Sequence, residues 1–191
     1  KGKLSAGMEA REPALNTRRY IKIRNGKHPL LKSESTVPLN IEFGGDTKGV
    51  IITGPNTGGK TVALKTIGLL SVMACCGLHI PCEDANLAMN ADVFCDIGDG
   101  QSIAENLSTF SSHIKNIIRI LEKADEECLI LLDELGSGTD PAEGMGIAVA
   151  VLEELRRKGC LFVVTTHYPE VKEYGERAEG VINARMAFDK E

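Results

Sequence analysis

A glycine-rich run occupies residues 53–61, directly after the apolar segment 49–52, and its residues 54–61 have the spacing G-x-x-x-x-G-K-T. In such a run the glycines let backbone N–H groups approach phosphate oxygens at the start of a helix. Lys60 reaches the β and γ phosphates as a mobile charge, and the hydroxyl of Thr61 is offered to Mg²⁺. Because a β-branched strand precedes the run and helix-forming residues follow it, we predict a nucleotide phosphate site rather than a bare glycine-rich turn.

Two acids follow a second apolar segment, 127–132, downstream of the loop. A carboxylate at such a strand end can hold Mg²⁺ beside a phosphate loop, and we assign this role to Asp133. Glu134 is expected on the other side of the strand end, where its carboxylate can polarise the attacking water. Acids after a strand are commonly ordinary loop residues, but their pairing with a phosphate loop favours the catalytic interpretation.

A histidine follows a third apolar segment, 162–166. Ligands of open parallel sheets collect at this edge, so His167 is predicted to contact the γ phosphate. A lone histidine at a strand end is commonly structural, and only its position relative to the other two motifs favours the functional role.

Hydroxyl side chains open a predicted helix at residues 108–113. A helix start with free N–H groups can bind an anion. Its distance along the sequence from the phosphate loop leaves open whether both serve one nucleotide. An ordinary N-cap at Ser108 fits the same pattern.

Apolar segments alternate with longer helical ones from residue 48 onward, which is typical of α/β layers with a mostly parallel sheet. Before residue 48, alternating residues at 20–24 and 39–43 predict small antiparallel strands with a turn at Asn25-Gly26. The later strands are expected at 48–53, 80–82, 91–97, 127–132, 160–165 and 181–188, and the helices at 59–76, 109–124 and 141–158.

The last of these helices has clear ends. Asp140 can accept from the first-turn N–H groups, Pro141 suits the first helical position, and Glu143 stands where the acid of a capping box belongs. Gly159 marks its end. Apolar residues recur at helical spacing and predict a packing face: Met145, Ala148, Val149, Leu152 and Leu155.

The chain has 191 residues and 42% apolar composition, enough for one sizeable core. No run of 18 apolar residues and no apolar leader core occurs, so we expect no membrane contact and a cytoplasmic protein. Six cysteines show no C-x-x-C spacing, which argues against a metal or disulfide role, and Cys128 and Cys160 open apolar strands as small hydrophobes.

The net charge of −5 is unevenly distributed. Residues 1–32 hold nine Lys and Arg against two Glu, a balance of +7, so the remaining 159 residues carry −12. An acidic body is a poor general ligand for nucleic acid. The basic segment could touch DNA or RNA, but we favour a solvated strand face or a connection to a further region.

Three motifs together are specific: Gly-Pro-Asn-Thr-Gly-Gly-Lys-Thr, Ser-Thr-Phe-Ser-Ser-His and Asp-Glu-Leu-Gly-Ser-Gly-Thr-Asp-Pro. With them, residues 20–190 resemble the ATPase domain of the MutS family, most closely its second bacterial subfamily, whose members often carry a C-terminal Smr nuclease domain. The resemblance implies a P-loop NTPase of ABC type. Its mostly parallel central sheet would be flanked by helices, with a small antiparallel part near the N-terminus. Residues 1–32 would be a remnant of the connection to lever and clamp regions plus the first strands, and 33–191 the ATPase domain.

The resemblance also implies the ligands. Hydrolysis of ATP to ADP would use Mg²⁺ held by Thr61, Asp133 and Gln101, with Glu134, His167 and Lys60 as catalytic residues. The residues expected to bind ATP are Gly54, Pro55, Asn56, Thr57, Gly58, Gly59, Lys60, Thr61 and Val62.

The implied assembly is a head-to-tail homodimer. Each nucleotide would be capped by Ser108 and Thr109 of the other chain, and the dimer contact would be lined by Gly136, Ser137, Gly138, Thr139 and Asp140. The family couples ATP state to a DNA clamp in repair and recombination. This subfamily is associated with branched DNA and, in some bacteria, collided ribosomes. Those contacts, and the nuclease, would lie outside these 191 residues.

Two rival interpretations remain. The chain could be a nucleotide-gated dimerisation switch with negligible hydrolysis in isolation, which the sequence does not separate from an ATPase. A transporter or chromosome-maintenance ABC head would share the loop and the acidic strand, but its usual Leu-Ser-Gly-Gly-Gln signature is replaced here by residues 107–111, Leu-Ser-Thr-Phe-Ser.

Overall fold

The computed structural model describes residues 2–31, 36–55, 59–98 and 106–186, with the backbone alone at residue 4 and at 106–109. Four predicted ligands lie outside the described residues: Asn56, Thr57, Gly58 and Gln101.

The predicted parallel sheet is confirmed. It has the order β6-β7-β8-β4-β9, and every neighbouring pair runs parallel. All residues of β7 and β8 are buried, which explains why these strands read as continuous apolar runs. The strands are β4 (Gly49–Thr53), β6 (Asp92–Asp96), β7 (Cys128–Leu132), β8 (Leu161–Thr166) and β9 (Val181–Arg185).

A second, mixed sheet contains the N-terminal strands in the order β1-β5-β2-β3. The predicted antiparallel pairing of β2 with β3 is confirmed. β2 belongs to the basic segment 1–32 and β3 to 33–191, so this sheet joins the two, and the domain division itself stays a prediction. The strands are β1 (Ala14–Asn16), β2 (Tyr20–Gly26), β3 (Leu39–Gly44) and β5 (Asp84–Ala88).

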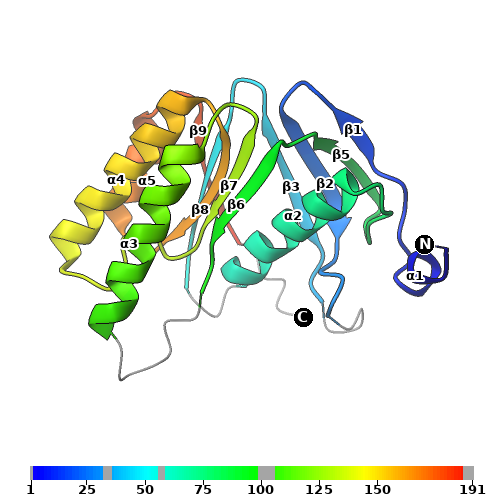
Figure 1. Ribbon diagram of the computed structural model, residues 1–191, viewed down its shortest axis with the longest axis horizontal. Coiled ribbons are helices and arrows are strands. Elements are labelled where there is room, and N and C mark those ends of the chain that lie inside the picture. Colours follow the sequence, from blue (N-terminus) through cyan, green and yellow to red (C-terminus); the bar gives the residue numbers. More distant parts are fainter. Residues whose placement is uncertain (1, 32–35, 56–58, 99–105, 187–191) are drawn as a thin grey trace.

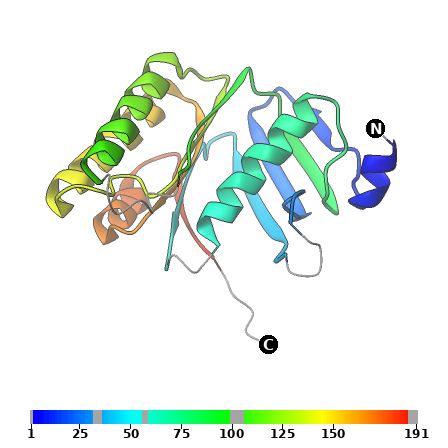
Figure 2. The ribbon, with the colours of Figure 1, turned by 60° about the horizontal axis from the view of Figure 1, so that its bottom comes forward.

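Helices separate and cover the sheets (Figure 1). Helix α2 lies between the two sheets, and its Leu64, Ile67 and Leu70 share one buried cluster with strand residues of both. Figure 2 shows the same arrangement of α2 between the two sheets from a second direction. The opposite face of the parallel sheet is covered by α3, α4 and α5. The helices are α1 (Gly2–Gly7), α2 (Lys60–Cys75), α3 (Asn106–Lys123), α4 (Pro141–Lys158) and α5 (Pro169–Arg177).

The turn predicted at Asn25-Gly26 is wrong. Both residues lie inside β2, where the register shifts between Ile23 and Gly26, and Gly26 pairs with Leu39. Asn25 has φ of 48°. Asn-Gly supplies positive φ to a β-bulge as readily as to a hairpin turn. The backbone N–H of Asn25 donates to the side chain of Asn40, which anchors the bulge on β3.

Other element boundaries also differ from the predictions. The strand expected at 80–82 is a single bridge between Arg11 and Ile80, and the strand itself is β5. Helix α3 begins at Asn106 rather than 109. The strand expected to reach residue 188 ends at Arg185. Helix α5 was not predicted.

The predicted start and end of α4 are confirmed. Asp140 accepts from the backbone N–H of Ala142 at 2.9 Å, and Gly159 takes φ of 71°. Glu143, expected in a capping box, instead accepts from the Thr139 hydroxyl at 2.9 Å. Cys128 and Cys160 are buried, as predicted for small hydrophobes. No helix among the described residues is long and apolar enough to cross a bilayer.

Candidate nucleotide site

The three predicted motifs follow β4, β7 and β8, which are consecutive in the sheet order β7-β8-β4. Since parallel strands end at the same edge, the residues after them gather there. The phosphate loop follows β4, the two acids follow β7, and His167 follows β8, the strand between them.

The described part of the phosphate loop has the backbone geometry that glycine permits. Gly54 and Gly59 have φ of 137° and 71°, and α2 begins directly after Gly59. Lys60 is 2% exposed, and its ammonium donates to the carbonyl of Gly54. Burial lowers the pKa of Lys60, while Glu134 and Asp133 oppose this shift. The positive charge of Lys60 therefore lies at the phosphate loop, where the negative charges of Glu134 and Asp133 stabilise it.

Asp133 is held by hydroxyl groups from two other elements. The hydroxyl of Thr61, in the first turn of α2, donates to Asp133 Oδ2 at 2.6 Å. The hydroxyl of Thr165, on β8, donates to Asp133 Oδ1 at 2.5 Å. Two of the three predicted metal ligands are thus in direct contact.

Thr165 was not among the residues predicted from the sequence. It is fully buried, and besides donating to Asp133 its hydroxyl accepts from the backbone N–H of Glu134 at 2.8 Å. Two adjacent threonines at the end of an otherwise apolar strand were the available signal. Thr165 fixes both the carboxylate of Asp133 and the backbone of the next residue.

Glu134 has φ of 48°, in the left-handed region that a residue with a side chain rarely adopts. Its side chain is 42% exposed, and His167 Nε2 lies 3.4 Å from Glu134 Oε1. Strain of this kind clusters at functional sites. Two of the three predicted catalytic side chains, Glu134 and His167, therefore face each other at the open end of the site.

The donor set suits Mg²⁺. Thr61 offers a hydroxyl oxygen and Asp133 a carboxylate, both hard ligands, and magnesium is commonly held by one or two carboxylates together with substrate phosphates. The described residues contain no cluster of three or more His, Cys, Asp and Glu that could hold a metal. The pair of Thr61 and Asp133 fits an ion that is bound together with its phosphate ligand.

The loop after β7 packs tightly on its surroundings. Gly136 has φ of 86°, and a Cβ added there would lie 2.4 Å from the carbonyl oxygen of Gly144 in α4. The hydroxyl of Tyr168 donates to the Gly136 carbonyl at 3.0 Å. This packing fixes the segment predicted to line a dimer contact.

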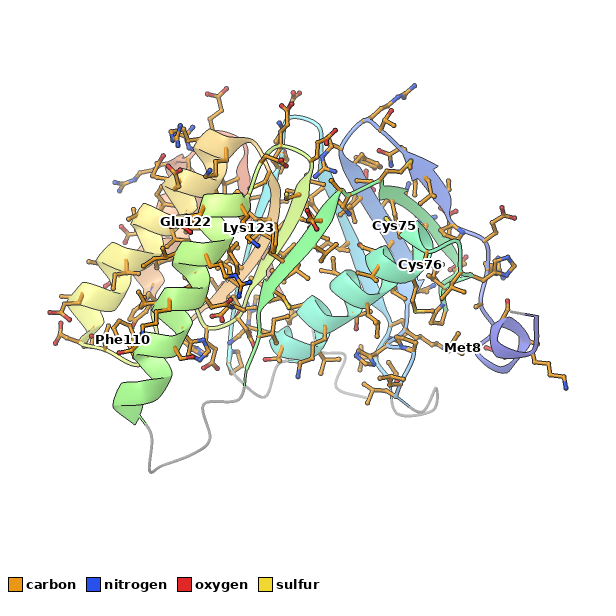
Figure 3. All side chains as sticks on the ribbon, viewed as in Figure 1. Met8, Cys75, Cys76, Phe110, Glu122 and Lys123 are labelled. Carbon is orange, nitrogen blue, oxygen red and sulfur yellow. The ribbon has the colours of Figure 1, made fainter. Side chains whose placement is uncertain are left out.

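The predicted signature residues Ser108 and Thr109 lie in the first turn of α3. Phe110, the next residue along, lies at this end of the helix (Figure 3). A Cβ added to Gly138 would lie 3.6 Å from Phe110 Cβ, so the helix start is packed against the loop after β7. The signature and the predicted dimer-contact segment are therefore neighbours within one chain.

A buried carboxylate to which the sequence assigned no role, Asp96, ends β6 beside these residues. It is 9% exposed and lies 2.7 Å from His113 Nδ1. The side chain of Asn116 donates to it at 2.8 Å, and its carbonyl accepts from the backbone N–H of Asp133 at 2.9 Å. Asp96 thus joins α3 to the residue expected to bind the metal.

These elements define an α/β domain with a phosphate loop at the edge of a parallel sheet. The family model described as MutS domain V matches residues 50–191. The chain therefore belongs to the MutS family.

Two relatives show which subfamily of the MutS family this chain resembles. Endonuclease MutS2 of Geobacillus kaustophilus is 53% identical over 192 residues, covering 100% of this chain and 24% of that protein. Endonuclease MutS2 of Halalkalibacterium halodurans is 54% identical, over 96% of this chain and 24% of that protein. The resemblance to the second bacterial subfamily is confirmed. The chain spans about a quarter of the length of these relatives.

Proposed function

We propose that this chain binds and hydrolyses ATP as the ABC-type ATPase domain of a MutS-family protein. The observation that carries the proposal is the contact of Thr61 and Thr165 with Asp133. It joins the helix after the phosphate loop to the acidic strand through the strand that lies between them. If the glycine-rich turn bound no ligand, there would be no reason for a carboxylate beside it to be held by two hydroxyl groups.

In the proposed mechanism Lys60 and the backbone N–H groups of the loop bind the phosphates. Bound Mg²⁺ would supply neutralisation of phosphate charge, with Thr61 and Asp133 as its protein ligands. Glu134 accepts a proton from the attacking water, and His167, 3.4 Å from its carboxylate, orients it and reaches toward the γ phosphate. Asp133 accepts from Thr61 and Thr165, whereas Glu134 lies beside His167, so the two acids take different roles.

A pair of variants tests these roles. Glu134→Gln should bind Mg·ATP as tightly as the unaltered protein and lose turnover by at least about a hundredfold, the lower range for loss of a general base. Lys60→Ala should lose binding itself. The measurements are phosphate release and calorimetric titration. Hydrolysis by Glu134→Gln at the parental rate would show that the base has been assigned wrongly.

A second function rests on the position of α3 beside the loop 136–140. The signature end of α3 contacts this loop within the chain, and the family resemblance implies that both also meet a partner chain. The chain could therefore be a nucleotide-gated dimerisation switch that hydrolyses little. Sedimentation with ADP, ATP and a non-hydrolysable analogue, beside a phosphate-release assay, separates the two. Dimerisation without turnover would favour the switch.

The partner of the whole protein is proposed to be DNA, bound through regions outside this chain. Membership of the MutS family supports this proposal, as does the name endonuclease carried by the relatives. Ribosome binding remains a proposal that rests on the family resemblance, and a cytoplasmic location remains one that rests on the composition of the sequence. The two partners can be distinguished by measuring how tightly the full-length protein binds branched DNA and ribosomes, each with and without ATP.

A further inference from the structure

Asp96 makes contacts in two directions, at the end of β6. Toward α3 its carboxylate meets His113 at 2.7 Å and Asn116 at 2.8 Å, residues one helical turn apart on the same face. Toward β7 its carbonyl oxygen accepts from the backbone N–H of Asp133 at 2.9 Å. A carboxylate that is 9% exposed requires such donors, because burying it without them is costly.

The rest of α3 is held differently. Beyond Asn116 the helix packs by apolar side chains, Ile117 and Ile120, against the parallel sheet. Apolar packing permits a helix to slide or rotate more readily than directed hydrogen bonds to a fixed carboxylate do. The polar contacts to the end of β6 come from His113 and Asn116, in the middle of α3, and the helix runs back from them to Ser108 and Thr109, so the position of that end of the helix is tied to this edge of the sheet.

We propose that Asp96, with His113 and Asn116, is a positioning cluster that fixes the signature end of α3 relative to Asp133. It would connect the metal side of one chain's nucleotide site to the helix that completes the partner's site. This inference rests on the proposed function, since it presupposes a composite dimer site. Asp96 itself touches neither ATP nor metal in this role.

The first test separates nucleotide binding from association. His113→Ala removes one donor to Asp96 and leaves the phosphate loop of its own chain intact. Its affinity for Mg·ATP, measured by calorimetry, should stay within about threefold, while its ATP-driven association, measured by sedimentation, should weaken about tenfold, as expected for loss of one charge-assisted hydrogen bond.

Two further variants control this test. His113→Asn can place an amide donor near the position of Nδ1, so it should recover most of the lost association. Arg119→Ala, an exposed change on the same helix, should have no effect. Parental association of His113→Ala, or an equal loss of its own nucleotide affinity, would overturn the proposal.

The second test asks whether replacing His113 reduces hydrolysis at the nucleotide site of its own chain or at that of the partner chain. In the full-length protein, the Lys60→Ala chain should be inactive alone, and the His113→Ala chain should lose most of its activity at concentrations where its weaker association leaves it largely unpaired. When they are mixed, about a quarter of the parental rate should return, because half of randomly paired dimers then hold one intact composite site of two. Recovery is not expected of a change that merely unfolds its own chain.

A matched mixture separates failure of this inference from failure of the proposed function. Lys60→Ala mixed with Ser108→Ala tests the composite site alone. If that mixture recovers activity and the His113→Ala mixture does not, the positioning role is wrong. If neither recovers while the unaltered protein hydrolyses ATP, the proposed composite dimer is wrong, and the positioning role that presupposes it falls as well.

Discussion

Thr165→Val offers a sharp test of how the site is held together. The substitution keeps the volume of a side chain that is fully buried and removes only its hydroxyl. That hydroxyl donates to Asp133 Oδ1 at 2.5 Å and accepts from the Glu134 N–H at 2.8 Å. Valine leaves a partly buried N–H without this partner and a carboxylate with one donor fewer.

The expected loss follows from these two contacts. An unsatisfied buried donor costs about 1–3 kcal/mol, and a hydrogen bond to a charged group contributes about 1.5–3 kcal/mol. Because Asp133 keeps its contact with Thr61 and is only partly buried, we expect the free energy of unfolding to fall by about 3 kcal/mol rather than by the full sum. Urea denaturation of the purified chain, followed by circular dichroism, measures this difference.

Thr66→Val is the matched control. Thr66 is also buried, at 3% exposure, but its hydroxyl donates only to the carbonyl of Val62 within the same helix, a bond that contributes little to stability. Its substitution should change the unfolding free energy by less than about 1 kcal/mol. If the Thr165 and Thr66 variants lost equal stability, the claim that Thr165 secures the site would be refuted.

Three other results are expected. Gly136→Ala should lose more than about 2 kcal/mol of unfolding free energy, because the backbone at this position is left-handed and the added Cβ would clash with Gly144. Gly146→Ala, in open space within α4, should gain about 0.5–1 kcal/mol. Equal effects of the two substitutions would contradict the packing described for Gly136. Asp140→Ala should cost about 1 kcal/mol in the same assay through loss of the N-cap, and an unchanged midpoint would exclude that role. Thiol labelling of the native chain should modify the three exposed cysteines, two of which are labelled in Figure 3, and spare the three buried ones. Burial raises the pKa of Cys82 to about 11 and that of Cys160 to about 12. Rapid labelling of Cys82 or Cys160 would contradict their burial.

The sequence predicted the parallel sheet well because its strands are buried on both faces. Continuous apolar runs such as 128–132 and 161–164, bounded by glycine-rich or polar segments, are typical of strands covered by helices on each side. Strand β5, with the sequence Asp-Ala-Asn-Leu-Ala, was misplaced because its residues favour strands weakly. It forms because β1 and β2 pair with it on either side, and such tertiary pairing leaves no local pattern.

Helix α5 was missed for a similar reason. It is short and mostly polar, with only Val171 and Gly175 buried, so its apolar period is too sparse to detect. Pro169 at its start was a usable signal.

In the candidate site, the sequence indicated the groups that would meet a ligand and missed those that hold them. Lys60, Asp133 and His167 follow strands or begin a helix, so topology alone gathers them at one edge. Thr165 and Asp96 act through contacts with residues distant in sequence, 32 positions away for Thr165 and Asp133. The spacing of residues along one chain carries no sign of such pairs.

Calorimetric titration of the purified protein with ATP, in the presence of Mg²⁺ and after its removal by chelation, tests the central claim most directly. Saturable binding that weakens without Mg²⁺, and that Lys60→Ala abolishes, is the predicted result. Absence of any magnesium-dependent affinity for adenine nucleotides, in protein shown to be folded, would contradict the account.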